Sequence, residues 1–185
     1  MYTDVHSFVK VYKNNVDISI CKETLEILSK NEWQPHIFYN AVDDTHYQNE
    51  NEPDAQFGDF QQYESLCKAH HKTVGDYVSS LNYSWFDHWL GMSNPKFNRY
   101  HPGQTMTPHV DHIREIFDGE LRGVPLLSVL SVIENTAQFG EFVVCGREFD
   151  LRQGDTIIFP SNFMFPHSVK DTVEGSRISA INWVF

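Results

Sequence analysis

The sequence predicts an α+β fold in which helices pack on the outside of a β-sandwich or jelly roll. Two segments in the first half of the chain, 17–33 and 60–90, carry apolar residues at helical spacing. The second half, from about residue 95 to residue 185, holds short β-branched or aromatic runs that are separated by Gly, Pro or Asp. Because no linker divides the two halves and the helices need a surface to cover, we expect one domain over residues 1–185.

The part of the chain over residues 1–91 is expected to be mainly helical. In the segment 17–33, Asp17 or Ser19 is a suitable N-cap, and the apolar face consists of Ile20, Thr24, Ile27 and Leu28. In the segment 60–90, the corresponding face consists of Tyr63, Leu66, Cys67, His70, Val74, Tyr77, Val78 and Leu81. The stretch 41–60 between them, "AVDDTHYQNENEPDAQFGDF", is polar and acidic, which favours a loop or flap.

The part over residues 95–185 is expected to form the jelly-roll core. Its strand candidates are "VPLLSVLSVIE", "EFVVCG", "REFDL", "DTIIFP" and "RISAINWVF". Many short strands at close, regular spacing are typical of sandwiches and jelly rolls.

Composition and charge exclude several classes of protein. Fourteen Lys and Arg against twenty-five Asp and Glu give a net charge of −11, which disfavours a nucleic-acid partner. No apolar run approaches the ~20 residues that cross a bilayer, so no membrane partner is expected. The N-terminal stretch lacks the basic start and apolar run of a signal peptide, and the three cysteines form no CxxC pair. These features predict a cytoplasmic protein with reduced thiols.

His109 and Asp111 in "TPHVDH" are the first candidates for a metal site. In an extended strand, residues i and i+2 point to the same face, so this imidazole and this carboxylate can reach one cation. The third ligand must come from elsewhere, and His167 is favoured because several strands fit between it and Asp111. The other histidines are His6, His36, His46, His70, His71, His88, His101 and His112. Two histidines and one carboxylate form the facial triad that leaves open positions on Fe(II).

Arg177 lies ten residues after His167, in the apolar segment "SRISAINWVF". A charge inside such a strand needs a partner, and a guanidinium group matches a carboxylate. Ser179 points to the same face and adds a donor. A dicarboxylate that binds the metal at one end would place its other carboxylate here.

The chain resembles the Fe(II)- and 2-oxoglutarate-dependent dioxygenases, in particular the prolyl 4-hydroxylase-like branch. The resemblance covers about Phe97 to Phe185 and is carried, in this order, by "FNRYHPGQTMTPHVD", "GEFVV", "GDTIIFPS" and "PHSVKDTVEGSRIS". It implies a double-stranded β-helix (jelly-roll) core with the N-terminal helices on its outside. It also implies Fe(II), 2-oxoglutarate as cosubstrate, and O2, with ascorbate as a supporting reductant.

The resemblance assigns roles to individual residues. His109, Asp111 and His167 would bind the iron, and Arg177 with Ser179 would hold the distal carboxylate of 2-oxoglutarate. Two further residues, Tyr100 and Ser128, match positions that contact the cosubstrate in relatives. No catalytic residue beyond the metal centre is implied, because this chemistry uses no protein general base.

The implied reaction is hydroxylation of an aliphatic C–H bond with release of succinate and CO2. A peptide or protein side chain, led by a peptidyl proline, is the first substrate class, and a free amino acid or other small molecule is the second. Met106 stands where many prolyl hydroxylases have a tyrosine, and Trp183 stands where the nucleic-acid demethylase branch has a second arginine. Two alternatives stay open: a jelly-roll metal-binding or 2-oxoglutarate-sensing module without turnover, and a structural jelly roll whose HxD is coincidental.

Overall fold

The computed structural model describes residues 4–40, 43–111 and 125–185. Neither α-helix in these ranges combines the length and the apolar character that a membrane crossing requires. The elements are η1 (Val5–Phe8), β1 (Lys10–Tyr12), α1 (Ile18–Leu28), β2 (Gln34–Pro35), β3 (Phe38–Asn40), β4 (Thr45–Tyr47), β5 (Asp54–Phe57), α2 (Glu64–Leu81), β6 (Lys96–Tyr100), β7 (Met106–His109), β8 (Leu127–Asn135), β9 (Gln138–Phe139), β10 (Phe142–Val144), β11 (Arg147–Phe149), β12 (Thr156–Pro160), β13 (His167–Val169), β14 (Thr172–Glu174) and β15 (Arg177–Val184).

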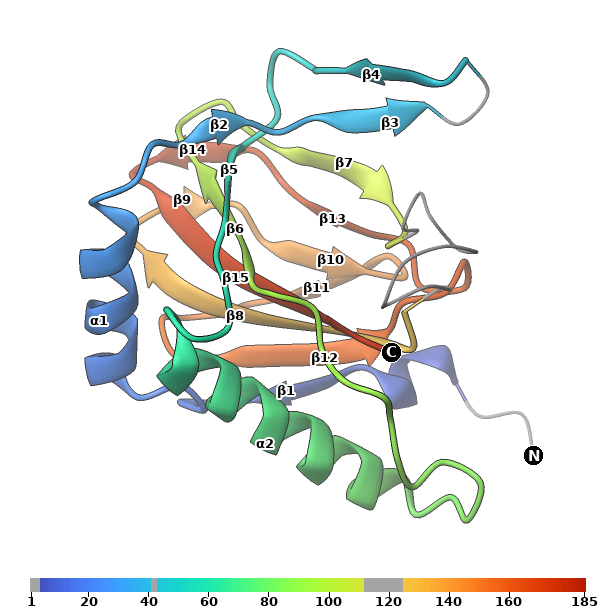
Figure 1. Ribbon diagram of the computed structural model, residues 1–185. Helices are drawn as coiled ribbons and strands as arrows, with labels where there is room; N and C mark the ends of the chain where they lie inside the picture. The colour runs from blue at the N-terminus through green and yellow to red at the C-terminus, as the bar shows by residue number, and fades with distance from the viewer. Residues whose placement is uncertain (1–3, 41–42, 112–124) are drawn as a thin grey trace.

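Two antiparallel sheets face each other (Figure 1). The larger sheet has the strand order β1-β12-β8-β15-β6-β5-β2, and the smaller sheet has the order β11-β10-β13-β7. From β6 onward the chain passes back and forth between the sheets, and it places β6, β8, β12 and β15 in one and β7, β10, β11 and β13 in the other. This alternation confirms the expected α+β fold with a double-stranded β-helix core.

Both expected helices form, although the second is shorter than the pattern indicates. Asp17 caps α1, because its carboxylate accepts a hydrogen bond from the backbone N–H of Ser19. α2 ends at Leu81, since Asn82 adopts the left-handed conformation with φ 53° and ψ 41°. The apolar residues at 83–90 therefore continue as a non-helical segment, in which Trp85 is 78% exposed.

The expectation that residues 1–91 are mainly helical is wrong for the segments that join the sheets. β1, β2 and β5 all belong to the seven-stranded sheet, and β3 pairs with β4 in a separate hairpin. β5 lies inside the stretch 41–60 that the sequence assigned to a loop, and it pairs antiparallel with β6 from Asp54 opposite Arg99 to Phe57 opposite Lys96. The backbone N–H and C=O groups on the outer edge of β6 need hydrogen-bond partners. A polar segment such as β5 can supply them, because the pairing uses backbone groups and does not depend on apolar side chains.

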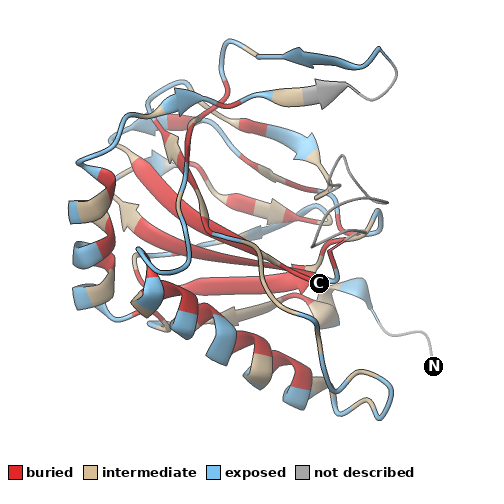
Figure 2. Cartoon of the chain, in the orientation of Figure 1, coloured by how far each residue is buried: buried red, intermediate tan, exposed pale blue. Residues whose placement is uncertain are grey.

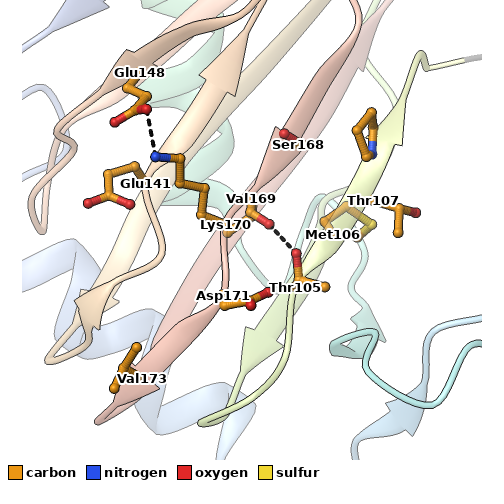
Figure 3. A pocket seen from close by; sticks show the side chains of 11 residues that line it. Thr105, Met106, Thr107, Glu141, Glu148, Ser168, Val169, Lys170, Asp171 and Val173 are labelled. Atoms are coloured by element: carbon orange, nitrogen blue, oxygen red, sulfur yellow. Dashed lines mark hydrogen bonds and ion pairs between the residues drawn. The ribbon is translucent and has the colours of Figure 1, made fainter.

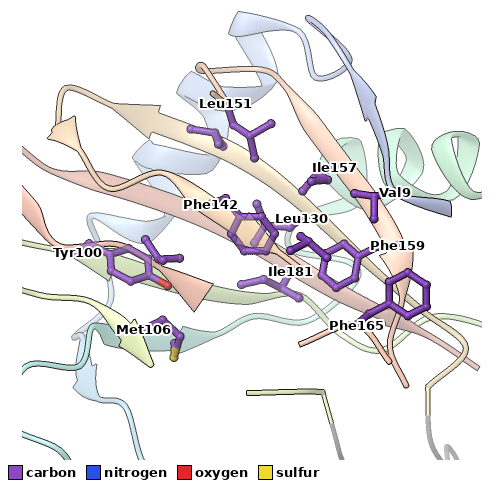
Figure 4. Close-up of a cluster of buried hydrophobic side chains, with 13 residues drawn as sticks. Val9, Tyr100, Met106, Leu130, Phe142, Leu151, Ile157, Phe159, Phe165 and Ile181 are labelled. Atoms are coloured by element: carbon purple, nitrogen blue, oxygen red, sulfur yellow. The ribbon is translucent and has the colours of Figure 1, made fainter. Parts of the chain in front are cut away.

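Alternation along the strands of the larger sheet divides the core into two layers. Inward-facing residues pack against the smaller sheet in the inner cluster, which includes Tyr100, Met106, Leu130, Phe142 and Phe159 (Figure 4). Outward-facing residues of the same strands pack under α1 and α2, which cover the outer face of this sheet (Figure 2). The space between the two sheets therefore holds the side chains at even positions of β6 and at odd positions of β15. From β8 it holds Ser128, Leu130 and Val132, and beyond the register shift of this strand Asn135 lies opposite Arg177.

Candidate metal centre and carboxylate pocket

β7 and β13 bring His109 and His167 together. The two residues are directly opposite each other in the antiparallel register of these strands. Their ring centroids lie 4.3 Å apart, and the two ring planes meet at 56°. His109 is the last residue of β7 and His167 is the first residue of β13, so both imidazoles lie at the same end of the smaller sheet.

Asp111 completes this group two residues after β7 ends. Its Oδ1 lies 3.5 Å from Nε2 of His167 and 3.8 Å from Nε2 of His109. One ligand atom from each of the three residues falls within 4.8 Å of the others. The expected same-face placement of His109 and Asp111 is thus present, and the three side chains converge closely enough to hold one metal ion.

Hydrogen bonds fix which nitrogen of each imidazole is free. Nδ1 of His109 donates to the carbonyl of Thr107 at 2.8 Å, and Nδ1 of His167 donates to the carbonyl of Phe165 at 3.2 Å. Nδ1 of each ring therefore carries a proton, and Nε2, which faces Asp111, is the nitrogen that binds a metal when the imidazole is neutral. Sequence reasoning did not identify these carbonyl partners, although each lies two residues before its histidine.

Burial and neighbouring charges set the protonation of the group. Burial and the charge of His167 lower the pKa of His109, which favours the neutral imidazole. Burial alone would raise the pKa of Asp111. The hydrogen bond and charge of His167, the charge of His109 and the hydrogen bond from Ser128 outweigh burial and hold that pKa well below its usual range. An ionised carboxylate beside two imidazole rings is a donor set suited to a divalent cation, because a metal binds the neutral form of each imidazole.

Ser128 lies at this metal end of the inner face. Its hydroxyl donates to Oδ2 of Asp111, and its Oγ lies 2.8 Å from Oγ of Ser161. The resemblance assigned the Ser128 hydroxyl to 2-oxoglutarate. In the structure this hydroxyl donates its hydrogen bond to Asp111, a candidate metal ligand. Ser161, which sequence reasoning did not single out, directly follows β12 and forms the other side of this hydrogen-bond pair.

Arg177 occupies the opposite end of the inner face. It is the first residue of β15, lies opposite Tyr100 of β6, and is only 1% exposed. Its Nη1 donates to the carbonyl of Gly140, whereas Nε and Nη2 are buried and have no hydrogen-bond partner among the described residues. Burial lowers its pKa, but a guanidinium group remains charged at neutral pH. A buried cation with two unpartnered donor atoms suits the binding of an anion.

Two more expected residues lie beside Arg177. Ser179 points to the same face of β15 and is fully buried, and its Oγ has no partner among the described residues. Tyr100 is 1% exposed, and burial raises its pKa, so it keeps its phenolic proton. Arg177, Ser179 and Tyr100 are thus a cluster of polar side chains inside an otherwise apolar core.

The other histidines that the structure describes are not part of the metal centre. His70 is buried on the outer face of the larger sheet, where it lies 2.7 Å from both Oδ1 of Asn182 and Oγ of Ser131. His36 contacts Lys96, and His112 lies outside the described residues.

A hollow of about 740 Å³ lies on the outside of β7 and β13 and is separate from the metal centre (Figure 3). Lys170 and Glu148 form an ion pair of 2.6 Å across it. Thr105 donates a hydrogen bond to the carbonyl of Val169 beside it. None of the seven predicted site residues lines this hollow.

Comparison with known families identifies the second half of the chain. The model of the 2OG-Fe(II) oxygenase superfamily matches residues 95–185, which span β6 to the C-terminus and contain the whole candidate centre. This part of the chain belongs to that superfamily. Membership implies Fe(II), 2-oxoglutarate and O2 as the reaction's cofactor and cosubstrates. No curated protein sequence matches the chain significantly.

Solved structures of prolyl hydroxylases share the fold of the oxygenase. A viral collagen prolyl hydroxylase from Paramecium bursaria chlorella virus-1, in complex with 2-oxoglutarate, has a TM-score of 0.68 and 12% identity over 96% of this chain and 94% of that chain. A Trichoplax adhaerens prolyl hydroxylase, in complex with a peptide fragment of a hypoxia inducible factor, has a TM-score of 0.69 and 15% identity. The match covers 96% of this chain and 83% of that chain. A Pseudomonas putida prolyl-4-hydroxylase has a TM-score of 0.68 and 16% identity, and the match covers 96% of this chain and 91% of that chain. The likeness extends over the N-terminal strands and helices as well as the core.

The residues present fit the groups that the superfamily implies. Two imidazole nitrogens and one carboxylate suit Fe(II), and three ligands leave coordination positions open. The unpartnered Nε and Nη2 atoms of Arg177 suit a carboxylate, and the buried Oγ of Ser179 adds a hydrogen-bonding group next to them.

Proposed function

We propose that residues 1–185 form one oxygenase domain that hydroxylates an aliphatic C–H bond, with 2-oxoglutarate as cosubstrate and succinate and CO2 as products. The observation that carries this proposal is the state of Arg177, a buried cation whose Nε and Nη2 have no partner among the described residues. A jelly roll that only binds a metal has no use for such a group, because an unsatisfied buried charge is costly.

In this proposal His109, Asp111 and His167 hold Fe(II). Fe(II), when bound, supplies the oxidation chemistry with O2 that protein side chains lack. The protein's own contribution is to orient the ligands. The Thr107 and Phe165 carbonyls hold the two imidazoles through Nδ1, and Ser128 positions the Asp111 carboxylate.

Arg177 holds the distal carboxylate of 2-oxoglutarate in this proposal, with Ser179 and Tyr100 as neighbouring hydrogen-bonding groups. Burial strengthens this interaction because little water competes for the guanidinium group. Phe142 and Phe159, whose rings lie 5.7 Å and 4.9 Å from the ring of His167, exclude water from the same space.

The first substrate class that we propose is a peptidyl proline, and the second is a free amino acid or other small molecule. Similarity of fold to prolyl hydroxylases, one of them bound to a peptide fragment, supports the first class. Met106 distinguishes this chain from the prolyl hydroxylases that carry a tyrosine at the same position. Its side chain is 4% exposed and packs in the inner cluster.

The test is succinate release from 2-oxoglutarate in the presence of Fe(II), ascorbate and O2, followed by a search for substrates that gain the mass of one oxygen atom. We expect turnover in the wild type and none in His109→Ala, which also loses iron affinity. If no coupled or uncoupled turnover occurs and His109→Ala binds iron normally, the proposal fails. Arg177-dependent binding of 2-oxoglutarate without turnover on any substrate would instead favour a sensing module.

A further inference from the structure

Lys96 is a cation at the metal end of the inner face that the proposed reaction leaves unused. As the first residue of β6 it lies opposite Ile181 of β15, whose side chain belongs to the inner cluster. Tyr100 is four residues further along β6 and lies opposite Arg177. At about 3.3 Å per residue, Lys96 is therefore about 13 Å along the sheet from the cluster around Arg177.

No carboxylate among the described residues forms an ion pair with Lys96. Its Nζ donates to Nε2 of His36 at 2.5 Å, and it lies 5.8 Å from the ring centroid of Phe57. Burial and the charge of Lys96 lower the pKa of His36 to about 3, so His36 is a neutral acceptor and compensates none of the charge. Burial lowers the pKa of Lys96 to about 8, while the charges of Asp111 and Glu52 act in the other direction, so Lys96 is mostly protonated at neutral pH.

A second donor lies on the same face. Trp183 is two residues beyond Ile181 on β15, which makes Lys96 and Trp183 diagonal neighbours on adjacent strands. The indole Nε1–H of Trp183 is buried and has no hydrogen-bond partner among the described residues. Since an indole nitrogen can only donate, the group that satisfies it must be an acceptor. An ammonium group and an N–H donor that share one face suit the oxygens of a carboxylate.

We propose that Lys96, with Trp183 as a second donor, binds a carboxylate of the substrate, so that the oxygenase acts on carboxylic acids. This inference rests on the proposed function, because it places the acid next to the centre formed by His109, Asp111 and His167. The charge of Asp111 acts on Lys96, which is consistent with that proximity. The carboxylate can belong to a free amino acid or to an acidic residue beside the hydroxylated residue of a peptide.

The experiment compares acids with their uncharged partners by calorimetric titration into protein loaded with Mn(II) and 2-oxoglutarate. One arm uses L-proline against L-prolinamide, and the other uses N-acetyl-Asp-Pro-amide against N-acetyl-Asn-Pro-amide. We expect the acid to bind about tenfold or more tightly than its partner in one arm, which identifies the source of the carboxylate. Equal binding or no binding of both members in both arms overturns the inference.

Two variants and a control tie the preference to this residue. Lys96→Met is expected to lose the preference for the acid, and Lys96→Arg, which keeps a cation, is expected to retain it. Lys68→Met removes the same charge from the exposed side of α2 and serves as the matched control. A preference for the acid that survives in Lys96→Met overturns the inference. The inference is also overturned if Lys96→Met loses affinity for 2-oxoglutarate by the same factor as it loses affinity for the acid. If the wild type binds no 2-oxoglutarate, the proposed function itself fails, whereas normal 2-oxoglutarate binding without acid preference overturns only this inference.

Discussion

His109 and His167 form a cross-strand pair between β7 and β13, with their ring centroids 4.3 Å apart. Backbone pairing of the two strands therefore fixes the separation of the imidazoles before any metal is bound. Each ring donates a hydrogen bond to the carbonyl two residues before it, and this bond holds the side chain in one rotamer. A centre organised in this way on paired strands is rigid, and its affinity is sensitive to the hydrogen bonds around it.

Ser128→Ala is expected to weaken metal binding about 10- to 100-fold, because it removes the hydroxyl that holds Oδ2 of Asp111. Titration of Mn(II) into the purified variant measures this. Ser131→Ala is the matched control, since Ser131 lies on the opposite face of β8 and contacts His70 and Thr156. Unchanged Mn(II) affinity in Ser128→Ala would show that this hydrogen bond does not position the ligand.

Arg177→Met is expected to weaken 2-oxoglutarate binding roughly a hundredfold while Mn(II) affinity is kept. The apo variant is expected to unfold at the same temperature as the wild type or at a higher one, because a buried cation with two unpartnered donor atoms is replaced by an apolar chain. Thermal unfolding with and without Mn(II) and 2-oxoglutarate measures both effects. A variant that is still stabilised by 2-oxoglutarate would exclude Arg177 as its anchor.

The free energy of unfolding is expected to fall as the pH is lowered from about 6.5 to about 4. Burial lowers the pKa of His70 to about 4, so over this window the unfolded chain binds a proton that the folded protein does not. The full effect corresponds to roughly 3 kcal/mol, and His36, whose pKa is about 3, acts in the same direction. Urea unfolding at pH 7.0, 5.5 and 4.5 measures the slope.

The part of this slope that belongs to His70 is isolated by substitution. His70→Gln is expected to show a shallower dependence on pH, because glutamine can form hydrogen bonds at this position but does not titrate. The matched control, His88→Gln, changes an exposed histidine and is expected to keep the wild-type slope. Identical slopes in all three proteins would contradict a neutral, buried His70.

Met106→Tyr, which restores the residue of many prolyl hydroxylases, is expected to destabilise the protein by about 1–3 kcal/mol. Met106 is 4% exposed and packs in the inner cluster, so the larger ring displaces its neighbours unless it turns toward the hollow that Met106 also lines. Urea unfolding measures the change, and Met106→Leu, which preserves volume, should cost less than about 1.5 kcal/mol. Wild-type stability in the tyrosine variant would mean that the pocket already has room for the ring.

The sequence was informative where chemistry and periodicity coincide. The i, i+2 spacing of His109 and Asp111 placed both on one face, and the charge of Arg177 in an apolar strand marked a cluster of polar side chains inside the core. β8, β12 and β15 were recognisable because buried strands are continuously apolar. All of these features depend on residues that are close together in the chain or on an unusual residue type.

Other features could not be predicted, because they depend on contacts between distant segments. β5 has no apolar alternation, and its strand conformation follows from pairing with β6. The end of α2 depends on the left-handed conformation of Asn82, although the apolar pattern continues beyond it. The hydrogen bond from Ser128 to Asp111 could not be predicted either, because only the fold brings the two side chains together.

The position of the short N-terminal strands has a consequence for aggregation. β12 and β6 would otherwise be the outer strands of the jelly roll's larger sheet, with long rows of backbone groups open to pairing with another molecule. β1 covers β12 with three residues, and β5 followed by the two-residue β2 extends the sheet beyond β6. The sheet thus ends on both sides in strands too short to template edge-to-edge association. Truncation before residue 13 would uncover β12 and is expected to turn a monodisperse preparation into one that self-associates.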